Sequence, residues 1–345
     1  MSSITGNYQP GIVGWDIGGV NLKCVRVAEG ARLVSRSTPF EIQRSLGTLA
    51  EQMAVLHQKV GGEPGDRHAV TMTAELSQLF RSKREGVNRV LDSVRLAFGE
   101  PSVRVFATDG RFLTIEEARH APIAVAASNW SATARLVARV RPDCILIDIG
   151  STTSDIIPIS GGRVVASGAT DPARLASGEL VYTGVLRSPV ESYAVTVPFE
   201  GQPAFISAEG FAIAGDVWLT LGKIREGDYS TPTPDGRPKT AEFARERLAR
   251  VICADLEMLS PDAVLGIAEA LGAAQVVRVR EGLARVKRRW PALTTAVVTG
   301  LGAFLAQEAA QQEGLSAIDL ADSIGADAGR TAPAAAVALL LGANG

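Results

Sequence analysis

Hydrophobic positions along the chain form one strand-and-turn pattern that occurs twice, starting at Ile12 and at Ile145. When Asp16 is set over Asp148, the two copies match without a gap, so that Gly18 falls on Gly150, Gly30 on Gly162 and Ser35 on Ser167. Each copy predicts an apolar strand, a turn of small residues, a second strand, a glycine turn and a third strand. In the first copy, residues 11–38 hold these strands, with the glycine turn at Glu29-Gly30.

The rest of the chain alternates predicted strands with predicted helices, as is typical of an α/β fold. Strands are predicted at 69–73, 103–107 and 296–299, and helices at 45–60, 86–98, 114–120, 123–140, 240–258, 262–290, 303–313 and 331–341. Because the repeated unit occurs twice, we expect two related lobes around a central cleft. The N-terminal lobe covers residues 1–142, with an inserted segment at about 40–110, and the C-terminal lobe covers 143–345, with a mainly helical insertion at about 186–290.

Composition and charge exclude several classes of function. The 345 residues are 46% hydrophobic with a net charge of −2, so no basic surface for nucleic acid is expected. The apolar run 332–341 is too short to span a membrane, and Met1–Pro10 lacks the apolar core of a signal peptide. The cysteines Cys24, Cys144 and Cys253 are far apart in the sequence, which favours reduced thiols over a disulfide framework or a zinc site. We expect a cytoplasmic protein that acts on small molecules and forms a homodimer.

The small-residue turns after the two aspartates are suited to phosphate groups. A carboxylate at the end of a buried strand, such as Asp16 or Asp148, can hold Mg²⁺, and exposed backbone N–H groups favour an anion. Ordinary hairpins with tight glycine turns are the alternative interpretation, but two copies in one register favour a phosphate cradle shared by both turns. The candidate phosphate-binding residues are Gly18, Gly19, Asn21, Lys23, Gly150, Ser151, Thr152 and Thr153.

Seven residues after each aspartate, the copies carry opposite charges: Lys23 in the first and Asp155 in the second. A third glycine turn, Gly300-Leu301-Gly302, follows the predicted strand 296–299.

These three turns together resemble the actin-like ATPase superfamily of sugar kinases, heat-shock-type chaperones and actin. The resemblance implies that the first two turns bind phosphates, that the third covers a nucleoside or another part of a substrate, and that Lys23 is a phosphate-binding lysine. The second turn, Asp148 to Asp155, is similar to that of the hydantoinase/oxoprolinase branch of this superfamily. The first turn departs from that branch, which usually has threonine at the place of Val20 and aspartate at the place of Lys23. This departure argues against ATP-dependent ring opening.

Nearly the whole chain also resembles a family of tetrahydromethanopterin-linked C1-transfer pathway proteins found with methanofuran or methylofuran biosynthesis. The segments that carry this resemblance are 14–23, 72–76, 84–86, 128–134, 148–153, 177–184, 233–238 and 298–302. It implies a transferase that joins an aminomethylfuran-methyl diphosphate to a tyramine-type phenol bearing a γ-glutamyl group. An aryl ether forms and diphosphate leaves.

The implied reaction assigns roles to residues of the turns. Lys23, together with Mg²⁺ on Asp16 or Asp148, would stabilise the departing diphosphate. The phenol, with an ordinary pKa of about 10, needs a proton acceptor, and Asp155 and Glu179 are both candidates. Two other classes stay open: an ATP-dependent kinase or hydantoinase/oxoprolinase-type hydrolase, and a non-enzymatic nucleotide switch or scaffold of the actin type.

Two further residues and one loop of these motifs have two interpretations each. Glu75 is either a site residue or a charge at a helix N-terminus. Trp130 is either a ligand contact or part of the core. The loop 233–238 is either functional or exposed decoration.

Overall fold

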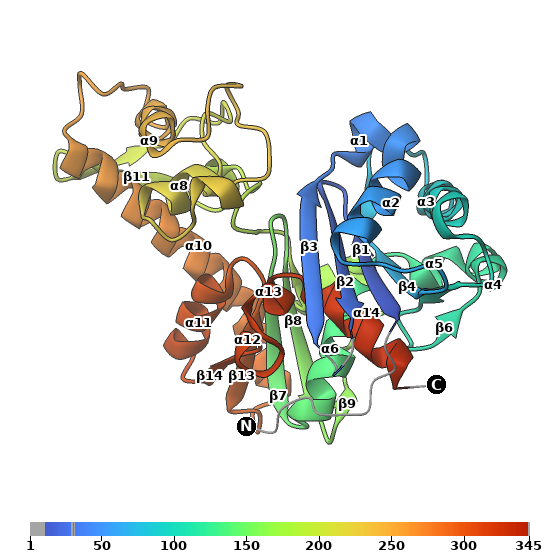
Figure 1. The fold of residues 1–345 in the computed structure, drawn as a ribbon. Coiled ribbons are helices and arrows are strands. Elements are labelled where there is room, and N and C mark those ends of the chain that lie inside the picture. The colour runs from blue at the N-terminus through green and yellow to red at the C-terminus, as the bar shows by residue number, and fades with distance from the viewer. Residues whose placement is uncertain (1–10, 29, 31, 344–345) are drawn as a thin grey trace. The chain divides into compact units, whose positions relative to one another are not determined.

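The computed structural model describes residues 11–28, 30 and 32–343, and these form two compact units (Figure 1). The first unit consists of Met1–Leu146, Ile157–Arg174 and Ile318–Gly345, and the second of Ile147–Ile156 and Leu175–Ala317. Both are discontinuous in sequence, and their boundaries fall inside the strands β7, β8 and β14 and the helix α7. The lobes and insertions expected from the sequence stay a prediction. Met1–Pro10, expected to be a polar terminus, and Glu29 of the expected turn lie outside the described residues.

The first unit is built on a mixed sheet whose central strands are β1 and β4. Strand β1 pairs antiparallel with β2 and parallel with β4, and β4 pairs parallel with β5. The three predicted strands of the first repeat are therefore confirmed as β1, β2 and β3. The strand order is β3 (Leu33–Pro39), β2 (Asn21–Val27), β1 (Ile12–Ile17), β4 (Arg67–Met72), β5 (Val103–Phe106) and β6 (Phe112–Leu113).

Helices cover both faces of this sheet, so every residue of β1 is buried. Alternate side chains of a strand point to opposite faces. Val13, Trp15 and Ile17 pack with α2 (Leu49–Lys59) and α3 (Lys83–Phe98), whereas Ile12 packs with α6 (Asn129–Val140) and α14 (Ala332–Gly342). The remaining helices of this unit are α1 (Ile42–Ser45), η2 (Leu46–Thr48), η3 (Ala74–Leu76), α4 (Ile115–His120), α5 (Pro122–Val125), α12 (Ala321–Ile324) and α13 (Ala326–Arg330), and α7 (Asp171–Ser177) crosses the boundary between the units.

The apolar C-terminal helix α14 lies directly on β1. All eleven of its residues are buried, which explains why it carries no polar face. A Cβ atom on Gly14 would lie 1.9 Å from the carbonyl oxygen of Ala334. Glycine at this position therefore allows the helix backbone to approach the strand.

One predicted helix of the first unit is interrupted. The helix expected over 123–140 divides into α5 and α6, and Ala127 between them has a positive φ of 49°. The interruption arises because Ala126 leaves the helix to form a parallel β-bridge with Met72 at the end of β4. Hydrophobic spacing predicts neither event, since both depend on a strand distant in sequence.

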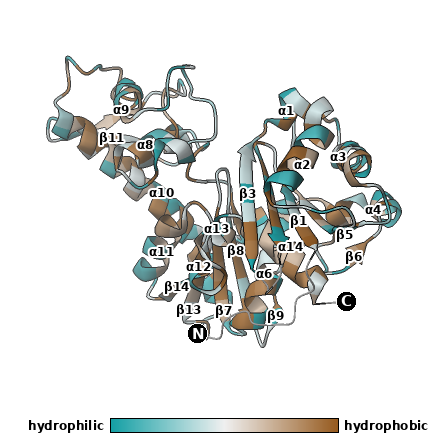
Figure 2. Cartoon of the chain, in the orientation of Figure 1, coloured by the Kyte–Doolittle hydropathy of each residue, from teal (hydrophilic) through white to brown (hydrophobic). Residues whose placement is uncertain are grey.

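The second repeat supplies the strands of the second sheet. Its central strand β7 and the neighbouring β13 consist of buried residues throughout, and their hydrophobic character is visible in Figure 2. This confirms the predicted strand at each place, although the third strand of the repeat is reduced to two residues. The order is β10 (Leu180–Val181), β8 (Ser154–Ser160), β7 (Cys144–Ile149), β13 (Thr295–Thr299) and β14 (Ser316–Asp319), with β9 (Arg163–Val164) paired to β8.

The second unit also contains a helical segment around the long helix α10 (Pro261–Arg289). Ser260 caps α10 by accepting a hydrogen bond from the amide of Ala263, and Pro261 occupies its first turn. The helix predicted over 240–258 is shorter, because α9 (Ala241–Arg250) ends before Cys253, which has a positive φ of 59°. The other elements are η4 (Val190–Ser192), β11 (Thr196–Phe199), β12 (Gln202–Phe205), α8 (Ala214–Thr220), η5 (Glu226–Asp228) and α11 (Ala303–Gln312).

Within the described part of the chain, no helix combines the length and the apolar character that crossing a membrane would require.

The close approach of α14 to β1 predicts a specific cost for adding one methyl group. Gly14→Ala should lower the free energy of unfolding by about 1–3 kcal/mol, the usual cost of overpacking. Gly266→Ala in α10 is the matched control, since a Cβ there meets nothing within 4 Å. It should raise stability by about 0.5–1 kcal/mol through helix propensity. Chemical denaturation of both variants measures the difference, and equal effects would contradict this view of the β1–α14 contact.

Candidate functional site

The first repeated turn connects β1 to β2 and carries an ion pair. The amide of Gly18 donates to the carbonyl oxygen of Asn21 at 3.0 Å, which closes the turn. Strand pairing sets Asp16 opposite Lys23, and Lys23 Nζ lies 3.2 Å from Asp16 Oδ2. Asp16 is only 4% exposed, and its other oxygen, Oδ1, has no hydrogen-bond partner among the described residues. Lys23 thus lies at the turn, as the sequence predicts.

The backbone of this turn has its carbonyl groups occupied and its amides available. The carbonyl of Gly19 accepts from the amide of Ile42 at 3.1 Å, and that of Val20 accepts from Phe40 at 2.8 Å. The amides of Gly19 and Val20 donate to no group of the described residues. Adjacent N–H groups that the fold leaves unused are what an anion requires.

The second repeated turn closes with the same hydrogen bond as the first. The amide of Gly150 donates to the carbonyl oxygen of Thr153 at 3.0 Å. The carbonyl of Gly150 accepts from Val185, and that of Ser151 accepts from Leu186 and Arg187. In the part of the chain that the structure covers, the amides of Ser151 and Thr152 have no acceptor. Both turns therefore present amides, and the phosphate cradle shared between them stays a prediction.

The third glycine turn packs against the end of β7, where Asp148 lies. A Cβ atom on Gly300, whose φ is 89°, would lie 2.6 Å from Asp148 Oδ1 and 2.4 Å from the carbonyl oxygen of Ile149. The amide of Gly302 donates to that carbonyl at 2.9 Å. The structure thus brings the turn Gly300–Gly302 to Asp148, and only a residue without a side chain fits at position 300.

Of the two candidate proton acceptors of the second unit, Asp155 lies on β8 and Glu179 directly precedes the neighbouring strand β10. Asp155 on β8 pairs with Leu180, the residue that follows Glu179. Glu179 is fully buried, and its Oε1 atom lies 3.1 Å from Nη2 of Arg289 at the end of α10. Arg289 also donates to the carbonyl of Ser177. The carboxylate of Glu179 is therefore held in an ion pair, and the choice between Asp155 and Glu179 stays open at this point.

A charged cluster in the first unit surrounds Glu75, which lies in η3 just after β4. Glu75 is 1% exposed, and neither carboxylate oxygen has a hydrogen-bond partner among the described residues. Lys83 Nζ lies 3.6 Å from Glu75 Oε1 and 2.6 Å from Asp171 Oδ2. Burial raises the pKa of Glu75 to about 7, although the Lys83 ammonium opposes this shift.

The same cluster extends to Trp130 on α6. The Arg174 guanidinium carbon lies 4.4 Å from the centroid of the Trp130 ring, and Arg174 Nη1 is 3.6 Å from Asp171 Oδ1. Trp130 is buried and stacked on a cation, so it is a core residue with a polar contact. Sequence reasoning missed Lys83, Asp171 and Arg174, and the only available signal was the three-residue spacing of Asp171 and Arg174 in an unassigned stretch.

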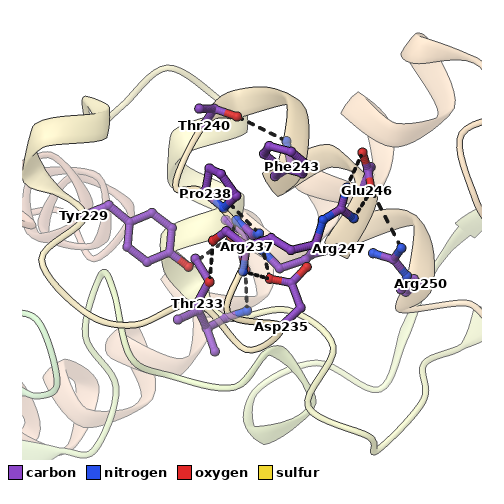
Figure 3. A network of polar contacts seen from close by, with 12 residues as sticks. Tyr229, Thr233, Asp235, Arg237, Pro238, Thr240, Phe243, Glu246, Arg247 and Arg250 are labelled. Carbon is purple, nitrogen blue, oxygen red and sulfur yellow. Dashed lines mark hydrogen bonds and ion pairs between the residues drawn. The ribbon is translucent and has the colours of Figure 1, made fainter.

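The loop 233–238 is held by a buried charge network in the second unit (Figure 3). Arg247 is fully buried, and its Nη2 atom lies 2.7 Å from Asp216 Oδ1 while its Nη1 atom lies 3.2 Å from Asp235 Oδ1. Thr233 is also buried, and its hydroxyl donates to the carbonyl of Arg237 at 2.7 Å. The loop is attached to Arg247 through Asp235, and its residue Thr233 is buried. Both observations argue against the interpretation of the loop as exposed decoration.

The residues expected to hold a metal are Asp16 and Asp148. No group of three or more His, Cys, Asp or Glu residues suited to a metal ion occurs in the described ranges. Mg²⁺, however, is usually held by one or two carboxylates together with phosphate oxygens and water. The buried Asp16 Oδ1 atom, which has no hydrogen-bond partner, fits such a ligand.

Comparison with known proteins places the chain among enzymes. A (4-{4-[2-(gamma-L-glutamylamino)ethyl]phenoxymethyl}furan-2-yl)methanamine synthase of Methanocaldococcus jannaschii is 39% identical over 331 residues, which cover 96% of this chain and 97% of the relative. The synthase of the same name from Methanococcus vannielii is 36% identical over 203 residues, or 58% of this chain and 90% of the relative.

A solved structure and a family model agree with the expected fold. The nucleotide-free structure of acetone carboxylase is similar with a TM-score of 0.53 and 12% identity, over 93% of this chain and 70% of that one. The predicted α/β fold of the actin-like ATPase type is confirmed. The model of the hydantoinase/oxoprolinase family matches residues 66–342. The chain therefore belongs to the hydantoinase/oxoprolinase family.

Proposed function

We propose that this protein is a transferase of methanofuran-type cofactor biosynthesis, which joins an aminomethylfuran-methyl diphosphate to a γ-glutamyl tyramine-type phenol. The observation that carries the proposal is the 39% identity to the M. jannaschii synthase over almost the whole of both chains. The name of that enzyme describes a furan methanamine joined by a phenoxymethyl group to a γ-glutamylaminoethyl chain. The bond to be formed is therefore an aryl ether.

The turns have the chemistry that a diphosphate leaving group needs. In the reaction the phenolic oxygen forms a bond to the furfuryl carbon, the bond from that carbon to the diphosphate oxygen breaks, and the electron pair leaves with diphosphate. Amides such as those of Gly19 and Ser151 bind phosphate oxygens, and the Lys23 ammonium neutralises the developing charge. Mg²⁺, held by Asp16 or Asp148, would supply further positive charge to the phosphates.

Location and assembly complete the proposal. We propose a cytoplasmic location, which the thiols support: Cys24 and Cys144 are buried, Cys253 is exposed, and none forms a disulfide within the described residues. Small molecules are the proposed partners, and a homodimer stays a prediction. ATP would be a ligand only under the alternative function, an ATP-dependent kinase or hydrolase. The fold shared with acetone carboxylase is the reason to test that alternative.

Counting diphosphate and phosphate separately tests the reaction. With Mg²⁺, the protein should release diphosphate from the furan donor only when the phenol is present, at about 1 s⁻¹ or faster. Omission of the phenol is the control, and chelation of Mg²⁺ should suppress the release. ATP turnover at that rate without diphosphate from the furan donor would reject the transferase function in favour of the ATP-dependent alternative. Inactivity with both donors would favour a scaffold.

Removing the charge of Lys23 tests the role of the first turn. Lys23→Gln should lower kcat about 100-fold, the usual effect of losing one charge-stabilising donor. Lys59→Gln is the matched control, because Lys59 is an exposed lysine at the end of α2. Since Lys23 also pairs with the buried Asp16, circular dichroism at the assay temperature should verify that the variant is folded. Near-normal turnover of folded Lys23→Gln would exclude this role.

A further inference from the structure

Glu75 lies at the same edge of the first sheet as the turn that carries Lys23. Parallel strands β1 and β4 end side by side, with Ile17 opposite Met72. The amide of Thr73 donates to the carbonyl of Ile17 at 3.0 Å, and a Cβ on Gly18 would lie 3.7 Å from Thr73 Oγ1. Glu75 follows two residues later. Ligands of open α/β sheets bind at the carboxyl ends of the strands, which is where this edge lies.

Glu75 has one ion pair, to Lys83, and that pair is long. Its carboxylate is buried and lacks a hydrogen-bond donor among the described residues, an arrangement that disfavours the folded state when the group is charged. The nearest cation, Lys83 Nζ, is beyond hydrogen-bond distance at 3.6 Å and is bound more closely to Asp171 at 2.6 Å. The carboxylate oxygens therefore keep unused capacity to accept a hydrogen bond or a proton.

Burial, together with the charges around Glu75, brings its pKa close to neutral pH. Lys83 faces it from α3 and Asp171 from α7, and Arg174 lies beyond Asp171. Burial is the largest influence and raises the pKa of Glu75 to about 7, with Asp171 acting in the same direction and Lys83 against it. A base of this kind can take a proton and return it to solvent in each turnover.

We propose that Glu75 is the general base of the transfer reaction and that Lys83 is its positioning residue, a proposal that rests on the function proposed above. The phenolic O–H bond of the acceptor breaks, and its proton passes to the Glu75 carboxylate. The phenolic oxygen then bonds to the furfuryl carbon as diphosphate leaves with the electron pair of the broken C–O bond. The products are the ether, diphosphate and one proton on Glu75, so the step needs no further reactant.

This assignment places the base in the first unit, on the sheet that bears Lys23. Glu179, one of the two candidates from the sequence, has its carboxylate in an ion pair with Arg289. That ion pair occupies one oxygen of the Glu179 carboxylate, whereas both oxygens of Glu75 lack a hydrogen bond among the described residues. Asp155 and Glu179 therefore serve as comparison residues in the test.

Removing the carboxylate should slow the reaction in a way that depends on the acidity of the acceptor. Glu75→Gln should lower kcat about 10²- to 10⁴-fold, the usual contribution of a general base, with little change in KM for the furan donor. The loss should shrink with a ring-fluorinated tyramine derivative, because its phenol gives up the proton more easily. Glu51→Gln, at an exposed position of α2, should retain normal rates.

The pH profile distinguishes a base from a residue that only shapes the site. In the unaltered protein, kcat/KM should rise with pH through about 7 and then level off, and Glu75→Gln should lack this rise. Three results would overturn the assignment: an equal loss of rate for both acceptors, an unchanged rate, or disappearance of the rise with pH in Asp155→Asn or Glu179→Gln instead.

The same measurements separate the failure of the base from the failure of the proposed function. If the unaltered protein is active and Glu75→Gln is equally active, only the role of Glu75 as the base is rejected. If the unaltered protein releases no diphosphate, the transferase function is rejected and the base with it.

Thermal unfolding gives a readout of Glu75 that needs no activity. The folded pKa is raised above its ordinary value of 4.5, so between these values the folded state binds the proton more strongly than the unfolded state. The Tm of the unaltered protein relative to Glu75→Gln should therefore fall as pH rises from about 4.5 to about 7 and stay constant above that. A constant difference across this range would show that Glu75 does not titrate near neutral pH and would refute its role as the base.

Discussion

One backbone hydrogen bond, from the amide of Thr73 to the carbonyl of Ile17, ties together the ends of two parallel strands on which the first unit's site depends. It fixes the chain after β4 beside the turn after β1, so Lys23 and Glu75 reach the same edge of one sheet. That pairing requires β1 to be central and buried on both faces. Hence α14 approaches Gly14 closely on one side, while α2 and α3 pack on the other.

The repeat conserves a backbone arrangement while its charges differ. Both turns close with a hydrogen bond from a glycine amide to the carbonyl three residues later, and both have carbonyls bound to neighbouring segments. Each turn is therefore rigid and presents amides. The side chain seven residues after the aspartate differs, however, because Lys23 is a cation and Asp155 an acid. The first turn, with its added cation, therefore has the charge that suits a leaving group that gains negative charge.

The strands and turns were the most predictable part of the molecule, because their signals are local. Apolar runs and glycine at the turns place β1, β2, β7 and β8 correctly from sequence alone. The division of the helix over 123–140 was missed because the bridge from Ala126 to Met72 joins distant segments. The Glu75 cluster was missed for the same reason, since Lys83 and Asp171 are 88 residues apart. Spacing arguments cannot bring such residues together until the sheet is known.

The hydrogen bonds of a buried acid distinguish a residue that holds the fold from one that is suited to a reaction, and Asp216 and Glu75 are the two examples. Asp216 accepts hydrogen bonds from Arg247, from the Tyr229 hydroxyl and from the amide of Ile213, so its charge is fully used in fixing a loop. Breaking such a network leaves a charge buried without a partner, which costs about 3–5 kcal/mol.

Glu75 has the opposite surroundings. It is as buried as Asp216, yet no hydrogen bond from the described residues reaches its oxygens. Its one ion pair, to Lys83, is long at 3.6 Å, so the carboxylate of Glu75 has fewer close contacts than that of Asp216. A buried carboxylate with empty acceptor sites is, in contrast, what proton transfer from a bound phenol requires. The difference in hydrogen bonding between two equally buried acids thus separates the residue that holds the fold from the residue suited to the reaction.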